Sequence, residues 1–207
     1  MDSWKLDNDN NVRIYSGLVQ KYGCDVRALD WGSRESQQLR FSVLAQVGNL
    51  DGASVLDVGC GLGDFFEWTR NSGLVVHYTG IDLTPSMIEL ARQRFPRARF
   101  EVADLLSYAP IVTDGFDFVV ESGIFTFRKQ DAFDYLKATV TRMFDLCSRA
   151  VAFNCLSAWA PGQDAGEFYA DPLKTTEFCR SLTPWVVLRH DYHARDFTVY
   201  MYRDRAA

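Results

Sequence analysis

The hydrophobic and polar positions along the chain alternate between two patterns, one typical of strands and one typical of helices. Short apolar runs that end in glycine or an acidic residue are typical of buried strands, and they alternate with segments whose apolar residues recur at helical spacing. The pattern predicts strands over residues 55–58, 75–82, 99–104, 116–123, 150–155, 185–192 and 196–202. It predicts helices over residues 11–22, 33–47, 64–73, 86–95, 130–147 and 173–182. This alternation indicates an α/β fold with a doubly wound sheet, in which the last two strands pair as a hairpin through residues 193–196.

The segment before the first strand is predicted to be only partly ordered. Residues 1–10 are polar and rich in Asn and Asp, so a loose end is expected there. Gly23 is expected to end the first helix. Ser33 is placed to cap the second helix, because its hydroxyl oxygen can accept a hydrogen bond from a free backbone N–H. The apolar spacing in that second helix predicts a buried face made of Leu39, Val43, Leu44 and Val47.

Three glycines alternate directly after the first strand, at Gly59, Gly61 and Gly63. A backbone without Cβ atoms can take positive φ angles and lie close to a ligand. The helix that follows points its free N–H groups at the same place. The sequence therefore predicts a ligand site at the carboxyl end of the first strand, where open α/β sheets bind ligands. A dinucleotide fingerprint would need Gly or Ala at Asp64, and the Gly-Lys-Ser/Thr of a phosphate-binding loop occurs nowhere in the chain.

The next two predicted strands also end in acidic residues. Asp82 lies 19 residues after Gly63, where a nucleoside-binding fold places a carboxylate that accepts hydrogen bonds from ribose hydroxyls. The alternative is a capping or solvated Asp82, but Thr84 and Pro85 already supply an N-cap and a first-turn proline for the next helix. Asp104 closes the third strand. Acids at successive strand ends indicate a nucleoside site.

The series Asp57, Gly59, Gly61 and Gly63 resembles the acidic-x-Gly-x-Gly-x-Gly signature of class I S-adenosylmethionine (SAM)-dependent methyltransferases. The resemblance covers about residues 50–203. It implies a single-domain, Rossmann-like α/β fold with a seven-stranded mixed sheet whose last strand is antiparallel. It also implies an N-terminal helical lid over residues 1–48, a SAM-binding core over residues 49–207, and SAM as the cofactor.

The same resemblance assigns contacts to the cofactor. Asp82 would accept hydrogen bonds from the ribose, Asp104 would accept from the adenine amine, and Leu105 would pack against the adenine ring. A carboxylate suits that amine because it only accepts hydrogen bonds. Trp31, in the loop before the second helix, would pack on the cofactor or the substrate, or else pin the lid to the core. The expected cofactor contacts are Trp31, Ser33, Asp57, Gly59, Cys60, Gly61, Gly63, Asp82, Leu83, Met87, Asp104, Leu105 and Glu121.

Methyl transfer from a sulfonium mainly requires an acceptor atom held in line in a desolvated pocket, and a protonated acceptor also requires a base. The candidates for a catalytic base are Glu121, His190, His193 and Tyr192. Imidazole has a suitable unperturbed pKa, and Glu121 follows the fourth strand, close to the expected methyl position. The alternative role for Glu121 is to bind the methionine ammonium. The chain lacks the Asn/Asp-Pro-Pro-Tyr/Phe tetrad of nucleobase and glutamine methylation, and no metal-ligating set is expected.

Composition narrows the class of substrate. The net charge of −5, from 22 basic and 27 acidic residues, argues against binding to nucleic acid or to an anionic membrane. The five cysteines show no CxxC spacing, so reduced thiols and a cytoplasmic location are expected. The N-terminus is too polar for a signal peptide, and no apolar run reaches membrane-spanning length.

The sequence therefore predicts methyl transfer to oxygen or nitrogen of a small apolar or aromatic molecule. The aromatic content of 14% favours such an acceptor. Three alternatives remain open: a protein or RNA methyltransferase that acts with a partner subunit, a SAM-binding protein without catalysis, and a nicotinamide oxidoreductase, which Asp64 disfavours. The identity of the acceptor and the oligomeric state stay undetermined at this stage.

Overall fold

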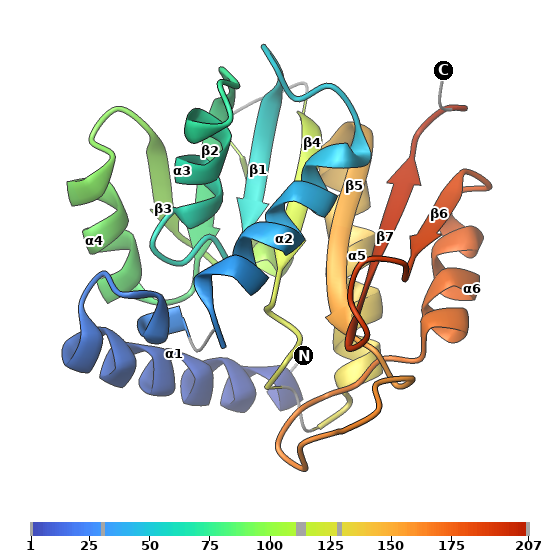
Figure 1. Cartoon of the computed structure of the whole chain (residues 1–207), viewed down its shortest axis with the longest axis horizontal. Helices are drawn as coiled ribbons and strands as arrows, with labels where there is room; N and C mark the ends of the chain where they lie inside the picture. The colour runs from blue at the N-terminus through green and yellow to red at the C-terminus, as the bar shows by residue number, and fades with distance from the viewer. Residues whose placement is uncertain (1, 30–31, 111–114, 128–129, 206–207) are drawn as a thin grey trace.

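Seven strands form one mixed sheet in the order β3-β2-β1-β4-β5-β7-β6 (Figure 1). The structure is a computed structural model that describes residues 2–29, 32–110, 115–127 and 130–205. Strands β1 to β5 run parallel, and β7 is antiparallel to both β5 and β6, so the predicted mixed sheet is confirmed. The strands are β1 Ser54–Val58, β2 His77–Asp82, β3 Arg99–Val102, β4 Phe116–Ser122, β5 Cys147–Leu156, β6 Val186–Arg189 and β7 Asp196–Tyr202.

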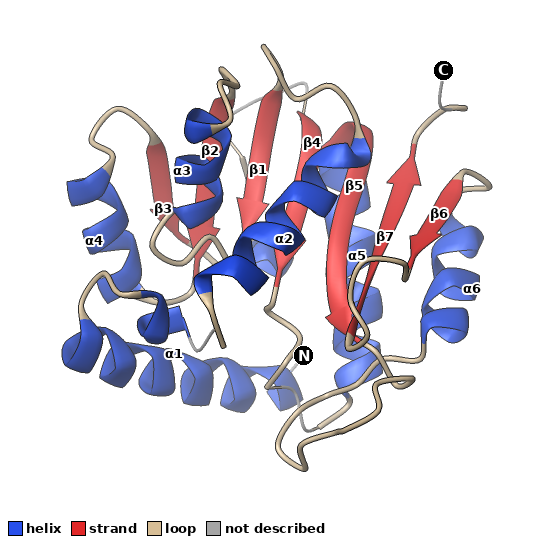
Figure 2. Ribbon diagram, viewed as in Figure 1, coloured by secondary structure: helices blue, strands red, loops and turns tan. Residues whose placement is uncertain are grey.

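Helices cover both faces of the sheet (Figure 2). Helices α2, α3 and α4 pack on one face, and α5 and α6 pack on the other. The helices are α1 Asp2–Tyr22, α2 Arg34–Leu44, α3 Asp64–Asn71, α4 Pro85–Arg94, α5 Ala132–Leu146 and α6 Pro172–Leu182. Short 3-10 turns cover Val26–Leu29, Ala45–Val47 and Leu105–Ser107. This three-layer arrangement confirms the predicted doubly wound architecture.

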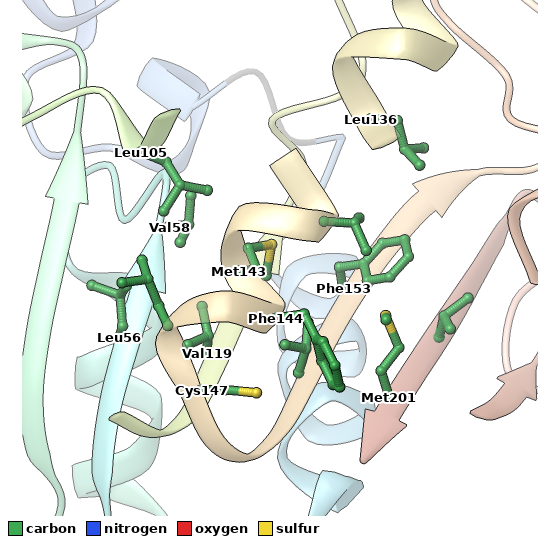
Figure 3. Packing of buried hydrophobic residues seen from close by; sticks show 14 of the residues in the cluster. Leu56, Val58, Leu105, Val119, Leu136, Met143, Phe144, Cys147, Phe153 and Met201 are labelled. Atoms are coloured by element: carbon green, nitrogen blue, oxygen red, sulfur yellow. The ribbon is translucent and has the colours of Figure 1, made fainter. Parts of the chain in front are cut away.

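The strand side chains alternate between two hydrophobic clusters because successive side chains of a strand point to opposite faces. In β1, Leu56 and Val58 belong to the cluster under α5, whereas Val55 belongs to the cluster under α2 and α3. Figure 3 shows Met143 of α5 packed among strand side chains that include Val119. With both faces buried in this way, the strands are fixed in register, and the carboxyl ends of the parallel strands β1 to β5 meet along one edge.

Residues 2–10 are helical, so the expectation of a loose end is wrong there. Helix α1 begins at Asp2 and lies across the carboxyl ends of the parallel strands (Figure 1). The indole of Trp4 packs edge-on against the ring of Tyr135, with the ring centroids 5.6 Å apart. Nδ2 of Asn8 donates a hydrogen bond to Oδ2 of Asp104 at 3.2 Å. These contacts to distant parts of the chain stabilise a segment whose own composition is unremarkable for a helix. Gly23, with φ of 58°, follows its end.

Helix α2 has the predicted cap, and three of the four apolar residues predicted for its buried face are buried: Val43, Leu44 and Val47, the last in the 3-10 turn after the helix. Oγ of Ser33 accepts a hydrogen bond from the backbone N–H of Ser36 at 3.1 Å, which confirms the N-cap. Leu39, however, is 37% exposed, whereas Gln37 and Arg40 are buried. Both of these polar side chains have acidic partners across the fold. We attribute the orientation of α2 to those contacts, which outweigh the burial of Leu39.

Strand β6 ends at Arg189, three residues earlier than predicted (189 against 192), so residues 190–195 form the connection to β7. His190 leaves the sheet because its Nε2 lies 2.7 Å from Oγ of the buried Ser157 at the end of β5. The guanidinium of Arg189 is paired with the carboxylate of Asp191 in the same connection. Local polar contacts therefore replace the last pairs of the predicted hairpin.

Candidate functional site

A cavity of about 170 Å³ lies at the carboxyl ends of β1 to β4. A single water needs roughly 10–15 Å³ by the same measure, so the cavity is large enough for a ligand of many atoms. Residues of α1 and α2 line it together with the strand ends. Nine of the predicted cofactor contacts line it: Asp57, Gly59, Cys60, Gly61, Asp82, Leu83, Met87, Asp104 and Leu105.

The turn after β1 requires its glycines. Gly59, Gly61 and Gly63 have φ angles of 72°, 52° and 79°, a region that other residues rarely adopt. A Cβ on Gly59 would lie 2.1 Å from Cγ2 of Ile124, and one on Gly61 would lie 2.6 Å from Cδ2 of Leu29. Gly63 does not line the cavity, and a Cβ there would meet the ring of Phe100 instead. The turn is therefore shaped by both backbone conformation and close packing.

Asp82 holds this turn from the end of β2. Its Oδ2 accepts a hydrogen bond from the backbone N–H of Gly61 at 3.0 Å, and its Oδ1 accepts from the N–H of Thr84 at 2.7 Å. Burial raises the pKa of Asp82, while these backbone hydrogen bonds oppose the shift. A carboxylate offers about four acceptor positions, so two remain after these bonds. Asp82 can therefore organise the turn and still accept from a diol in the cavity.

Asp57, the acid of the glycine signature, is buried at the end of β1. Oη of Tyr78 on β2 donates a hydrogen bond to its Oδ2 at 2.5 Å. Burial raises the pKa of Asp57 to about 7, and the hydrogen bond from Tyr78 partly offsets this shift. Near neutral pH the group is thus poised between its two protonation states. Burial also raises the pKa of the neighbouring Cys60 thiol, which keeps it protonated and unreactive.

Asp104 and Leu105 lie at the end of β3, on the far side of the cavity from α2. Oδ1 of Asp104 accepts a hydrogen bond from the backbone N–H of Leu106 at 3.0 Å, and Oδ2 accepts from Asn8 of α1. The side chain of Leu105 is buried. A carboxylate beside an apolar side chain provides the acceptor and the flat contact that the adenine amine and ring require. Helix α1 is attached to the same carboxylate.

None of the four candidate bases, Glu121, His190, Tyr192 and His193, lines the cavity. Glu121 is fully buried at the end of β4, and its Oε1 accepts a hydrogen bond from the backbone N–H of Ile124 at 2.6 Å. His190 is stacked on the ring of Phe197 and contacts the ring of Trp159 at a tilt of 35°. Nδ1 of His193 lies 2.5 Å from Oδ2 of Asp196. Ser33 caps α2 outside the cavity lining, and Trp31 lies outside the described residues.

Several lining residues were missed by reasoning from the sequence. From α1 they are Asn11, Val12 and Tyr15, from α2 Gln37 and Phe41, and from the segments after β4 and β5 Thr126, Tyr135 and Glu167. A signal existed for α1, since Val12 and Tyr15 recur at helical spacing. Gln37 donates a hydrogen bond to Oδ2 of Asp64 at 3.2 Å, which joins α2 to the start of α3. No pattern in the sequence marks that pair.

Glu121 provides a prediction about stability and pH. Burial raises its pKa from 4.5 to about 8, so between these values the folded protein keeps a proton that the unfolded chain loses. Folding stability should therefore fall as the pH rises from about 5 to 9. Glutamine keeps the acceptor for Ile124 but has no proton to lose. We therefore compare the free energy of unfolding of Glu121→Gln with that of wild type by urea unfolding. The difference, variant minus wild type, should be larger at pH 9 than at pH 5 by at least about 1 kcal/mol.

The control for this measurement is Glu89→Gln, which changes an exposed carboxylate on α4. Its stability relative to wild type should not vary with pH. A Glu121→Gln variant whose stability tracks that of wild type from pH 5 to pH 9 would show that Glu121 ionises normally in the folded protein.

Comparisons with known proteins agree with this geometry. A family model described as a methyltransferase domain matches residues 55–146. A protein of Mycobacterium tuberculosis named as a methyltransferase is 32% identical over 157 residues, which cover 72% of this chain and 92% of that protein. The trans-aconitate 2-methyltransferase of Variovorax paradoxus is 37% identical over 81 residues, and this match spans 39% of the chain but only 30% of that enzyme. The chain belongs to the class I SAM-dependent methyltransferases.

The fold has solved counterparts. Magnesium protoporphyrin IX methyltransferase from Synechocystis PCC 6803 with bound SAH (S-adenosylhomocysteine) superposes with a TM-score of 0.66 at 15% identity, and the match covers 95% of each chain. At this identity the likeness shows a shared fold. The residues of the site fit SAM: the glycine turn leaves no room for a Cβ, and the half-buried carboxylate of Asp82 retains acceptor positions toward the cavity.

Other kinds of site are less evident in the described parts of the chain. Over those residues, no group of three or more His, Cys, Asp or Glu side chains could hold a metal ion. No described helix is both long enough and apolar enough to cross a bilayer. All five cysteines are unpaired, and four of them are buried.

Proposed function

We propose that the protein transfers a methyl group from SAM to oxygen or nitrogen of a small molecule with an apolar or aromatic body. The observation that carries this proposal is the extent of the cavity. It runs from the strand-end acids to aromatic side chains of α1, α5 and the segment after β4, namely Tyr15, Tyr135 and Phe127. The rings of Tyr15 and Phe127 meet at a centroid distance of 6.3 Å. An apolar ring of a ligand would pack well against these aromatic side chains.

The position of α1 supports a small acceptor. The helix lies across the strand ends, and its Asn11, Val12 and Tyr15 line the cavity. A protein or RNA substrate would have to displace α1 to reach the strand ends. The names of two similar proteins, trans-aconitate 2-methyltransferase and magnesium protoporphyrin IX methyltransferase, also describe small-molecule acceptors. The net charge of −5 gives no support to a nucleic-acid partner.

Within this proposal, residues 1–48 form a lid over the core of residues 49–207. Two contacts between the parts support it: Asn8 donates to Asp104, and Gln37 donates to Asp64. Both acids line the cavity. Closure of such a lid would exclude water and orient the reactants. The unpaired cysteines support the accompanying proposal of a cytoplasmic location, since reduced thiols are the usual state there.

The residues divide the work of the reaction between binding and proton transfer. Asp82 would hold the ribose, Asp104 and Leu105 the adenine, and the turn at Gly59 and Gly61 the amino-acid part of the cofactor. When bound, SAM supplies an electrophilic methyl group, whose carbon–sulfur bond breaks as the acceptor's lone pair forms the new bond to carbon. Positioning alone supplies much of the acceleration of such a step. Glu121, His190 and His193 stay predictions for the base that takes the acceptor's proton.

A transfer assay tests the proposal. The intact protein is incubated with SAM that carries a radiolabelled methyl group and with a panel of phenols, aromatic amines, aliphatic alcohols and aliphatic amines. Parallel reactions contain a mixed peptide library or total RNA. We expect label in phenols or aromatic amines, with little in peptides or RNA. Label found only in peptide or RNA would overturn the proposal in favour of a macromolecular substrate.

A further inference from the structure

The charged side chains that line the large cavity are all acidic in the parts of the chain that the structure describes. They are Asp57, Asp64, Asp82, Asp104 and Glu167, and no described Lys, Arg or His lines the cavity. The four aspartates lie at or next to the carboxyl ends of β1 to β3 or at the start of α3, the part of the cavity that the proposed function gives to the cofactor. Glu167 differs, because it lies in the loop between β5 and α6.

This loop brings Glu167 to the aromatic part of the cavity. The backbone N–H of Phe168 donates a hydrogen bond to the carbonyl of Thr126 at 2.8 Å, which joins the loop to the segment after β4. Thr126 and Phe127 of that segment line the cavity together with Glu167. The ring of Tyr15 meets that of Phe127 at a centroid distance of 6.3 Å. Glu167 therefore lies in the part of the cavity that the proposed function gives to the acceptor.

One oxygen of the Glu167 carboxylate is held by the protein, and the other is available to a ligand. Oε2 accepts hydrogen bonds from Oη of Tyr169 and from Nη2 of Arg195, the latter at 3.1 Å. Within the described residues, Oε1 accepts no hydrogen bond. Nη2 of Arg195 also lies 3.2 Å from Oδ2 of Asp164. One guanidinium is thus shared between two carboxylates, and this group of three side chains keeps a net negative charge.

These contacts determine which chemical group of an acceptor would be stabilised there. A carboxylate oxygen only accepts hydrogen bonds, so its partner must carry an N–H or O–H group. The faces of the neighbouring aromatic rings attract cations. An anionic acceptor would meet like charges, and no described basic residue lines the cavity to pair with it. A protonated amino group satisfies both the carboxylate and the rings.

We propose that Glu167 is a specificity-determining residue that binds a protonated amino group of the acceptor. The acceptor is then an amine with an aromatic ring, in which the ring packs against Tyr15 and Phe127 and the ammonium lies against Oε1 of Glu167. This inference rests on the proposed function and deepens it by naming the class of substrate.

The test measures binding to protein saturated with SAH, by calorimetry. Three phenols share one ring and one hydroxyl and differ in charge: tyramine is a cation, 2-(4-hydroxyphenyl)ethanol is neutral and 4-hydroxyphenylacetate is an anion. We expect tyramine to bind about 10-fold more tightly than the alcohol, the usual scale for a hydrogen bond to a charged group, and the anion to bind most weakly. Phenethylamine and tryptamine extend the set of amines. Binding requires no methyl transfer, so this result stands apart from a failure of the transfer assay.

Two matched variants assign the selectivity to Glu167. Glu167→Gln keeps the shape of the side chain but removes its charge, and it should lower the affinity for tyramine about 10-fold while the affinity for the alcohol stays within about twofold. Glu177→Gln removes an exposed carboxylate on α6 and changes the net charge equally, so it should keep the wild-type selectivity. Unchanged SAH affinity in both variants shows that the fold is intact.

Three results would overturn the inference. The first is wild-type protein that binds 4-hydroxyphenylacetate as tightly as tyramine. The second is wild-type protein that binds none of the three amines at millimolar concentration. The third is a Glu167→Gln variant that keeps the preference for tyramine over the alcohol. The first two need no variant, so the test does not depend on the folding of Glu167→Gln.

Discussion

Replacing Gly59 by alanine is expected to destabilise the protein by about 2–5 kcal/mol and to abolish measurable SAM binding. Positive φ at a residue with a Cβ costs roughly 1–2 kcal/mol, and overpacking typically adds about 1–3 kcal/mol. At Gly59 both effects apply, because φ is 72° and a Cβ would lie 2.1 Å from Cγ2 of Ile124. Ile124 has little freedom to move away. Its branched side chain is stiff, and its backbone N–H is held by Glu121.

The chain provides a matched control for this substitution at Gly52. That glycine has a φ of 74°, but a Cβ there would meet nothing within 4 Å. Gly52→Ala should therefore cost only the conformational part, about 1–2 kcal/mol, and should leave SAM affinity unchanged. The double variant Gly59→Ala, Ile124→Ala should recover part of the loss, because the clashing methyl is gone. Urea unfolding and calorimetry measure both properties. Equal losses for Gly59→Ala and Gly52→Ala would refute the packing argument.

Asp82→Ala is expected to weaken SAM binding by roughly 1.5–3 kcal/mol, the range for hydrogen bonds to a charged group. This corresponds to a dissociation constant that rises about 10- to 150-fold. The variant would lose the hydrogen bonds between the carboxylate and the ribose hydroxyls. The backbone N–H groups of Gly61 and Thr84 would also lose their acceptor. Asp82→Asn distinguishes the two effects, because its amide oxygen can still accept from one backbone N–H.

Calorimetric titration with SAH measures the affinity of these variants. Asp117→Asn is a suitable control. Its carboxylate accepts hydrogen bonds from the backbone N–H and Oγ of Ser54 at the opposite end of the sheet. If a loss of stability of the whole fold lowered the affinity for SAH, Asp117→Asn would show a lower affinity as well. Unchanged affinity in Asp82→Ala would remove Asp82 from the binding site.

The sheet, the glycine turn and the strand-end acids could all be predicted because their signals are local. A strand is recognisable from its own apolar run, and the conformation of Gly59 and Gly61 follows from their spacing after it. Asp82 and Asp104 gain their positions from the parallel strands that they end, because the carboxyl ends of such strands meet at one edge. The periodic pattern therefore predicts most of the fold and the side of the cavity that the strands form.

The other side of the cavity depends on contacts between distant residues. The bond between Arg40 and Asp196 joins residues 156 positions apart, and it draws Arg40 into the fold while Leu39 stays exposed. Helix α1 is polar, and it is stabilised where Trp4 meets Tyr135 and Asn8 meets Asp104. A single sequence does not reveal which polar side chains will find partners across the fold.

The most direct test of the binding site is a crystal structure of the protein with SAH. We expect the adenosyl group in the cavity at the ends of β1 to β3, with both ribose hydroxyls within hydrogen-bonding distance of the Asp82 carboxylate and the adenine amine beside Asp104. SAH bound at any other place, or bound there with the Asp82 carboxylate directed away from its ribose, would contradict this description of the site.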